Sequence, residues 1–408
     1  MEQTIQVCYA IHDSDGSYAK FIGTSMDSIL ENTTAPVAFH ILHDDTLTAL
    51  NREKFQQLVD YYGATVAFYD LPALQGTFLD RAYALLADVW LSYYSKAVLY
   101  RFFVWQVLPR EVQRAIYFDA DILLNMDIRQ LWREPTGPCG LAAVVDIAVQ
   151  HNPERYNLIR DGFFDAGRYF NSGVLLMDRE AFTGNETWIQ ETLHFFQQYP
   201  AADFPDQDVM NYFFGKDYRQ LPYTYNQLVE WERLQQHGLT AGIYHFSGHV
   251  LNLDLDDCFT QRFFHYFMKT PWADEHFLNR FYCLVRSTYD SRTRDLQQLG
   301  NLLVQRKRVL IYEQFFAPQI DKAFRLQPEE EAIPCEDILG NVAAFTEAAV
   351  GLKNTHTMLI FSQHYPQIAQ AMAKAGLQQG RHFLDGRIFL FWGAGGYSLD
   401  EYEAFRRL

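Results

Sequence analysis

Hydrophobic and polar positions follow two alternating patterns over the first seventy residues. Short apolar runs cover 5–11, 37–42 and 64–69, and each run has the length of a buried strand. Between them, 18–30 and 48–62 carry apolar residues at intervals of three and four, as one face of a helix does. The resulting βαβαβ order predicts a parallel sheet of the nucleotide-binding type.

Two later apolar runs end in acidic residues. Residues 115–118 are apolar and aromatic and predict a buried strand, which the motif Asp119-Ala120-Asp121 follows directly. Residues 141–145 form a similar run before Asp146. Because ligands bind at the carboxyl ends of strands in open α/β sheets, these acids are candidate ligand-binding residues.

Small or polar residues mark three further elements. The segment 170–178 predicts a small-residue turn that leads into a strand, and 204–208 opens a helix with acids near its N-terminus. Residues 244–249 predict a short strand and a glycine turn, while 99–107 predict a helix.

The character of the sequence changes near residue 285, so we expect two domains, 1–285 and 286–408. Strands at 306–312 and 358–361 and a helix at 366–375 predict a small α/β accessory domain, with 381–384 as a further candidate strand. Residues 313–317 replace the glycines of a phosphate loop, and the glycines at 393–396 indicate a flexible loop.

Composition narrows the class of protein. The 408 residues carry a formal charge of −16, which disfavours duplex nucleic acid as a partner. No run of 18 apolar residues predicts a membrane span, and the N-terminus lacks the features of a signal peptide. The five cysteines form no Cys-x-x-Cys pair, so we expect a reduced, cytoplasmic protein.

Asp119-Ala120-Asp121 suggests metal chemistry. Two carboxylates at the end of a strand are hard oxygen ligands, which suit Mg²⁺ or Mn²⁺ better than zinc. An ion held by only two carboxylates has open coordination positions, which the oxygens of a diphosphate can occupy. The alternative is that the strand ends in solvent and the two acids are exposed turn residues without a ligand.

An ordered set of motifs over roughly the first 270 residues resembles glycosyltransferase family 8. The family resemblance implies retaining sugar transfer on a GT-A fold, a Rossmann-like mixed α/β sheet with flanking helices. The matching motifs are Val7-Cys8-Tyr9-Ala10, Tyr100-Arg101, Tyr117-Phe118-Asp119-Ala120-Asp121, Asp146, Phe170-Asn171-Ser172-Gly173-Val174-Leu175, Asp206-Gln207-Asp208 and His245-Phe246-Ser247-Gly248.

The resemblance also implies roles for particular residues. Asp119, Asp121 and His245 would hold Mn²⁺ or Mg²⁺, and the donor would be a UDP-sugar. Asp206 and Gln207 match positions around the donor sugar. The positions assigned to donor binding are Ala10, Asp13, Arg101, Asp119, Ala120, Asp146, Asn171, Ser172, Gly173 and Gly248.

Gln207 is the residue expected nearest the anomeric carbon, on the face opposite the phosphate. An amide is a poor nucleophile, so its presence favours same-face substitution through an ion pair over a covalent intermediate. Asp206 is the alternative nucleophile, by analogy with retaining hydrolases.

Two positions depart from the family pattern. A lysine that contacts the diphosphate is replaced by Leu251, so His249, another base or the accessory domain must compensate, or turnover is slow. The first loop, 12–16, is longer than usual, which leaves open whether His12 or Asp13 contacts the nucleoside.

The sequence thus predicts a metal-dependent hexosyltransferase that uses UDP-glucose or UDP-galactose. The acceptor would be a glycan, a glycolipid or a glycoprotein, and 286–408 would serve acceptor docking or homo-oligomer formation. The alternatives are a sugar-phosphate nucleotidyltransferase, which the acidic first loop disfavours, and a non-catalytic binder of nucleotide sugars.

Overall fold

The chain forms two compact units in the computed structural model. One unit comprises 1–248 and 262–274, and the other comprises 249–261 and 275–408. No helix in the described part of the chain is long and apolar enough to cross a membrane. The structure describes residues 3–86, 95–183, 187–200, 202–247, 257–283, 286, 306–317, 320 and 331–389.

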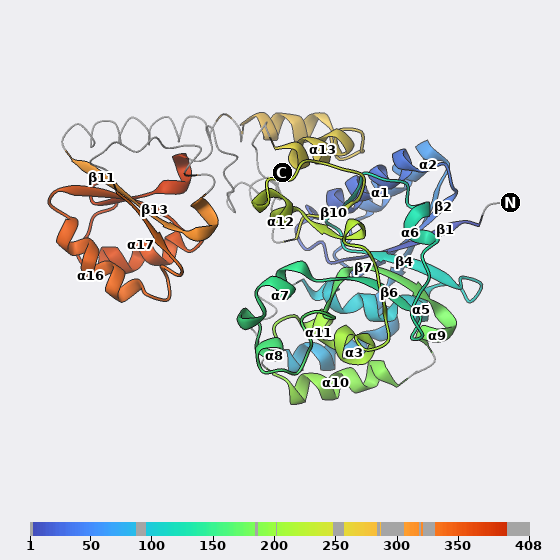
Figure 1. Ribbon diagram of the computed structural model, residues 1–408. Coiled ribbons are helices and arrows are strands. Elements are labelled where there is room, and N and C mark those ends of the chain that lie inside the picture. Colours follow the sequence, from blue (N-terminus) through green and yellow to red (C-terminus); the bar gives the residue numbers. More distant parts are fainter. Residues whose placement is uncertain are drawn as a thin grey trace. The chain divides into compact units, whose positions relative to one another are not determined.

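A seven-stranded mixed sheet forms the centre of the first unit, in the order β3-β2-β1-β4-β7-β6-β8 (Figure 1). β1 pairs in parallel with β2 and β4, and β2 with β3, so the predicted βαβαβ unit is confirmed. β7 runs antiparallel to both β4 and β6. The strands are β1 Ile5–Ile11, β2 Val37–His43, β3 Thr65–Asp70, β4 Arg114–Phe118, β6 Leu141–Val145, β7 Phe170–Asp178 and β8 Arg219–Gln220.

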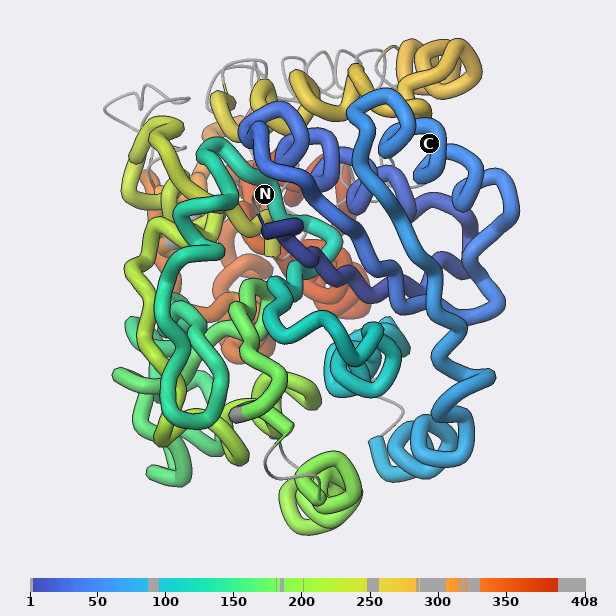
Figure 2. The backbone as a smooth tube through the Cα atoms, turned by 90° about the vertical axis from the view of Figure 1, so that its right-hand side faces the viewer, coloured from blue at the N-terminus to red at the C-terminus, as the bar shows by residue number. Residues whose placement is uncertain are grey.

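Helices cover both faces of this sheet, with α1, α2 and α13 on one face and α3, α10 and α11 on the other (Figures 1 and 2). Local signals set their ends: the Thr48 side chain caps α2, and Gly63, with φ 70°, ends it. The α-helices are α1 Ala19–Asn32, α2 Ala49–Tyr62, α3 Leu71–Leu85, α5 Val104–Val107, α6 Arg129–Trp132, α7 Ile147–His151, α8 Asn157–Arg160, α9 Arg179–Phe182, α10 Trp188–Gln198, α11 Pro205–Phe214, α12 Val229–Leu234 and α13 Cys258–Phe267. The 3₁₀ helices are η1 Lys96–Phe103, η2 Pro153–Arg155 and η3 Tyr223–Tyr225.

A second, three-stranded sheet adjoins the carboxyl end of β4. It contains β5 Ile122–Leu124, β10 Ile243–His245 and β9 Gln227–Leu228, in the order β5-β10-β9. β10 is antiparallel to β5 and parallel to β9. This small sheet brings a segment more than 100 residues downstream against the residues that follow Asp121.

The helix predicted at 99–107 is confirmed, although its residues form most of η1 and then α5. A second local prediction was wrong. The expected turn at the start of 170–178 is strand, since β7 already begins at Phe170. Pairing of β7 with a strand on each side outweighs the low strand propensity of Asn171, Ser172 and Gly173.

The second unit contains a parallel four-stranded sheet in the order β12-β11-β13-β14, with α16 and α17 packed on it. An α/β domain was predicted here, but β12 and α16 were missed. The boundary at 285 stays a prediction, because 284–285 and 287–305 lie outside the described residues, as do the glycines at 393–396. The elements are β11 Lys307–Glu313, η4 Gln314–Phe316, β12 Glu331–Cys335, α16 Val342–Leu352, β13 His356–Phe361, α17 Tyr365–Lys374, β14 Phe383–Asp385 and η5 Gly386–Phe389.

Candidate active site

Strand register brings three predicted metal ligands together. The β4–β7 ladder places Phe118 opposite Val174, and the next amide, that of Asp119, donates to the Gly173 carbonyl at 2.9 Å. The β5–β10 ladder places Ile122 opposite His245, so Asp121 lies beside the histidine. Asp119, Asp121 and His245 therefore meet where the two sheets adjoin.

The three side chains form a compact cluster. One ligand atom from each of Asp119, Asp121 and His245 lies within 4.8 Å of the others, and His245 Nε2 is 3.3 Å from Asp121 Oδ1. Burial acts to lower the pKa of His245, but the neighbouring carboxylates outweigh it and raise that pKa. For Asp119, by contrast, burial raises the pKa, although Arg101 opposes the change. The cluster thus concentrates negative charge that a cation would neutralise.

Asn226, which the sequence analysis missed, orients His245. The Gly173 amide donates to Asn171 Oδ1 at 2.9 Å, and that oxygen also accepts Asn226 Nδ2 at 2.8 Å. The Asn226 oxygen therefore faces His245 Nδ1, at 3.1 Å. Since an amide oxygen only accepts, Nδ1 carries the proton, and the Nε2 lone pair is available to a metal.

Gly173 leaves room for the cluster. A Cβ atom at this position would lie 2.4 Å from His245 Cε1 and 2.9 Å from Asp119 Oδ2. Any larger residue would therefore displace two of the three candidate ligands. The residues present fit a divalent cation: two carboxylates, one imidazole whose Nε2 faces the Asp121 carboxylate, and a glycine that admits all three.

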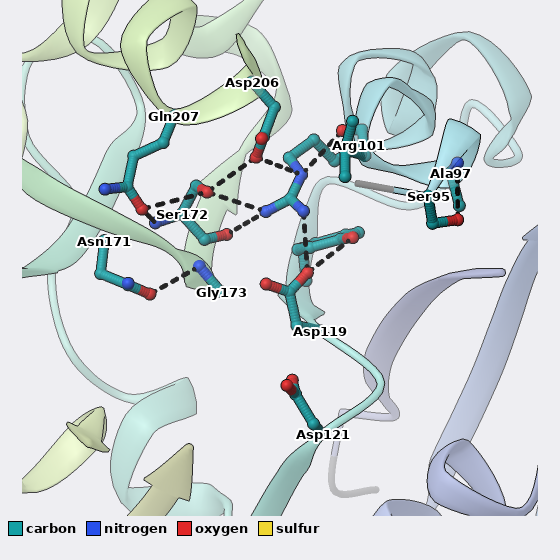
Figure 3. A network of polar contacts seen from close by, with 12 residues as sticks. Ser95, Ala97, Arg101, Asp119, Asp121, Asn171, Ser172, Gly173, Asp206 and Gln207 are labelled. Atoms are coloured by element: carbon teal, nitrogen blue, oxygen red, sulfur yellow. Dashed lines mark hydrogen bonds and ion pairs between the residues drawn. The ribbon is translucent and has the colours of Figure 1, made fainter. Parts of the chain in front are cut away.

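Arg101 connects the cluster of Asp119, Asp121 and His245 with the predicted sugar-site residues (Figure 3). Its Nη2 donates to Asp119 Oδ1 at 2.9 Å, and its Nε lies 3.1 Å from Asp206 Oδ2. Its Nη1 donates to the Ser172 carbonyl at 2.7 Å and to Ser172 Oγ at 3.0 Å. The guanidinium is buried over the Tyr117 ring, and Tyr117 donates to Asp119 Oδ1 at 3.1 Å. The buried Arg101 side chain thus holds Asp119, Asp206 and Ser172 in fixed positions relative to one another.

Gln207 and Asp206 lie in the first turn of α11 and face β7 (Figure 3). Gln207 Oε1 accepts the Ser172 amide at 2.9 Å, and Gln207 Nε2 donates to Asp146 Oδ2 at 3.1 Å. Asn171 Nδ2 donates to the same Asp146 oxygen at 3.0 Å. Asp206 Oδ2 accepts from Ser172 Oγ at 2.9 Å, in addition to its ion pair with Arg101. The predicted sugar-site residues therefore form one continuous network.

Asp208, the other acid of this motif, stabilises the start of α11 instead of joining that network. Its carboxylate accepts Tyr169 Oη at 2.6 Å and the Phe204 amide at 2.9 Å. Burial raises the pKa of Asp208 to about 7, although both hydrogen bonds oppose this change. The residue fastens the start of α11 to the core.

The predicted nucleoside positions lie at the carboxyl end of β1. Ala10 is packed in the core, and the buried Asp13 carboxylate accepts the Tyr18 amide at 2.6 Å and Asn51 Nδ2 at 2.7 Å. His12 is more exposed than Asp13, and its Nδ1 lies 2.5 Å from Asp44 Oδ2. Nucleoside contact by Ala10 or Asp13 stays a prediction.

Two further predicted positions have different outcomes. Ala120 is buried between the two aspartates. Gly248, together with His249 and Leu251, lies outside the described residues, so the replacement of the family's lysine stays a prediction. Asn226 is a polar residue directly before β9, and no sequence motif marks it.

The family model described as glycosyl transferase family 8 matches residues 10–250, more than half of the chain. The chain belongs to glycosyl transferase family 8. The predicted family is thereby confirmed, and the matched region contains every candidate site residue named above. It also contains Asn226, which the sequence analysis missed.

Two similar proteins are distant in sequence. General stress protein A of Bacillus subtilis is 23% identical over 288 residues, which cover 65% of this chain and 95% of that protein. Lipopolysaccharide 1,2-glucosyltransferase of Escherichia coli K12 is 25% identical over 228 residues, covering 55% of this chain and 63% of that enzyme.

Solved structures agree on the fold. The galactosyltransferase LgtC, in complex with donor and acceptor sugar analogs, matches with a TM-score of 0.55 at 16% identity, covering 67% of this chain and 99% of that chain. The bifunctional glycosyltransferase WbbM matches with a TM-score of 0.52 at 17% identity, covering 67% of this chain and 51% of that chain. At these identities the likeness shows the GT-A fold, as predicted, and nothing finer.

Proposed function

We propose that this family 8 glycosyltransferase is a metal-dependent, retaining hexosyltransferase that uses UDP-glucose or UDP-galactose. One observation carries the proposal: Asp119, Asp121 and His245 converge around Gly173, and Asn226 holds His245 with Nε2 available. The galactosyl- and glucosyltransferase names of the similar proteins support a hexose donor.

Asp119, Asp121 and His245 would hold Mn²⁺ or Mg²⁺. The ion would supply Lewis-acid stabilisation of the departing diphosphate. Asn226 keeps the histidine proton on Nδ1, and Arg101 holds Asp119 in place by a charge-assisted hydrogen bond. These contacts preorganise the cluster before the donor binds.

The polar network supports same-face substitution over a covalent intermediate. Asp206, the candidate nucleophile, is engaged by Arg101 and Ser172, which lowers its availability for attack. Gln207 is held by Ser172 and Asp146 and presents an amide. In this scheme the acceptor proton passes to the departing phosphate oxygen.

The remaining predictions stay part of this proposal. Residues 1–285 would be catalytic, and 286–408 would be an accessory domain that docks the acceptor or forms a homo-oligomer. The acceptor would be a glycan, a glycolipid or a glycoprotein, and a cytoplasmic location is expected from the cysteine usage.

A screen of UDP-sugars for UDP release in Mn²⁺, with and without candidate acceptors, tests the proposal. Asp121→Asn should lower turnover by orders of magnitude, because it removes one anionic ligand. The matched control is Asp161→Asn, since Asp161 pairs with Arg160 at the surface. Undiminished turnover in EDTA would overturn the metal role, and donor binding without turnover would favour a non-catalytic binder.

Stereochemistry gives an independent test. Retention predicts an α-linked product from the α-linked donor, which proton NMR of the purified product reports directly. A β-anomeric coupling constant would contradict the proposed use of Asp206 and Gln207.

A further inference from the structure

A group of aromatic and charged side chains beside the polar site has no role in the proposed chemistry. We call it the aromatic platform and define it as His151, Tyr156, Glu230 and Trp231. The ring centroids of His151 and Trp231 are 4.5 Å apart, with the ring planes at 44°. The end of α7 and the start of α12 therefore lie against each other.

Both arms of the platform begin at residues of the site. Asp146, which accepts from Asn171 and Gln207, is also the N-cap of α7. His151 is the last residue of that helix, roughly 7 Å farther along its axis. The other arm, α12, starts three residues after Asn226, the partner of His245. The platform thus borders the sugar and metal parts of the site.

Charges on both arms act on Tyr156. Burial raises the pKa of Tyr156 to about 12, and the negative charges of Asp146 and Glu230 add to the increase. Burial also raises the pKa of Glu230, although Arg233 and Arg155 oppose it. Tyr156 is therefore a neutral phenol that lies near a carboxylate of the site and one of the platform.

Much of the platform's hydrogen-bonding capacity is unused. Within the described ranges, no hydrogen bond joins the Tyr156 hydroxyl, the Glu230 carboxylate or the Trp231 indole to the protein. His151 uses Nδ1, 3.0 Å from the Ile147 carbonyl, which leaves Nε2. Tyr156, Glu230 and Trp231 are half-buried. Half-buried polar groups with unused capacity beside aromatic rings are typical of ligand sites.

We propose that the aromatic platform binds the sugar of the acceptor, an inference that rests on the proposed function. A pyranose has an apolar face of C–H groups, which suits the rings of Trp231 and His151, and its hydroxyls suit Glu230 and Tyr156. The Glu230 carboxylate and the chain's formal charge of −16 favour a neutral sugar over a phosphorylated or acidic one.

Glycoside binding tests the platform without turnover. The probes are p-nitrophenyl glycosides of glucose, galactose and N-acetylglucosamine, titrated by saturation-transfer NMR with UDP and Mg²⁺. Trp231→Ala should weaken binding about tenfold or more, and Trp231→Phe should recover part of it, because a flat ring remains. Glu230→Gln should weaken binding while keeping the shape of the side chain.

The matched control is Tyr61→Ala, an exposed aromatic on α2 that is 82% exposed. Its glycoside affinity should equal that of the wild type. Calorimetric UDP affinity should stay within about twofold in every platform variant, which separates acceptor binding from donor binding. In transfer assays the acceptor KM should rise more than kcat falls.

The outcomes separate the two proposals. A wild type that releases no UDP from any donor overturns the proposed function, while glycoside binding still decides the platform. Failure of every glycoside to bind the wild type, or equal binding by wild type and Trp231→Ala, overturns the platform.

Discussion

A Cβ atom on Gly173 would lie 2.4 Å from Cε1 of His245. The glycine sits in β7, where the strand passes closest to the imidazole, so the absence of a side chain there is a requirement of the cluster. The side chains of two candidate metal ligands therefore depend on one backbone position.

Gly173→Ala should abolish metal-dependent donor binding while leaving the protein folded. The added methyl group displaces His245 and Asp119, which hydrogen bonds with Asn226 and Arg101 hold in place. Calorimetric titration of UDP in Mn²⁺ checks the loss, and circular dichroism checks the fold. Gly351→Ala is the control, because a Cβ there meets nothing within 4 Å. Normal UDP binding by Gly173→Ala would contradict the prediction.

Asn226→Ala should weaken Mn²⁺ binding by roughly 10- to 100-fold, the usual cost of losing a partner that orients a ligating histidine. Without the Asn226 oxygen, the proton of His245 is no longer held on Nδ1. Electron paramagnetic resonance of free Mn²⁺ measures the affinity. Asn125→Ala, which removes an amide bound to the Thr240 carbonyl instead, should bind Mn²⁺ normally. Equal affinities for both variants would remove Asn226 from the site.

Arg101→Gln should lower the free energy of unfolding by about 3–5 kcal/mol, because it leaves buried carboxylates unpaired. Asp119 and Asp206 each lose their cationic partner. Arg101→Lys should recover only part of the stability, since a single ammonium cannot replace contacts made by three guanidinium nitrogens. Urea denaturation measures both values. A stability equal to the wild type in Arg101→Gln would mean that the network is not a structural unit.

Asp208 predicts a pH dependence of stability. Its pKa is about 7 in the folded protein, whereas an unfolded aspartate titrates near 3.9. Between these values the folded chain binds a proton that the unfolded chain has lost, so the free energy of unfolding should fall as the pH rises. The slope for this group is at most about 1.4 kcal/mol per pH unit.

Asp208→Asn should remove this contribution, because the amide does not titrate. Urea denaturation near pH 5 and near pH 7 measures the slope in wild type and variant. Asp60→Asn, at an exposed position on α2, should keep the wild-type slope. A slope in Asp208→Asn that matches the wild type would assign the effect to another group.

Local sequence patterns predicted much of the first unit. Over 5–69, short apolar runs alternate with segments whose apolar residues recur every three or four positions. This pattern predicted the parallel strands β1, β2 and β3, because burial in a sheet or on one helix face repeats at short range. Similarly, the apolar run before Asp119 predicted both the end of β4 and the place of the acids. Family motifs added His245 to those acids.

The tertiary structure alone decided how these residues work together. Nothing near Asn226 in the chain shows that it meets His245, since that contact depends on η3 and β9 reaching the end of β10. The partners of Arg101 likewise come from three separate segments: β7, α11 and the residues after β4. Which segments are buried, and which side chains follow them, could be predicted from the sequence because those properties are local. The contacts of Asn226 and Arg101 depend on the register between strands that are distant in the sequence. That register is set by the pairing of all strands in the sheet.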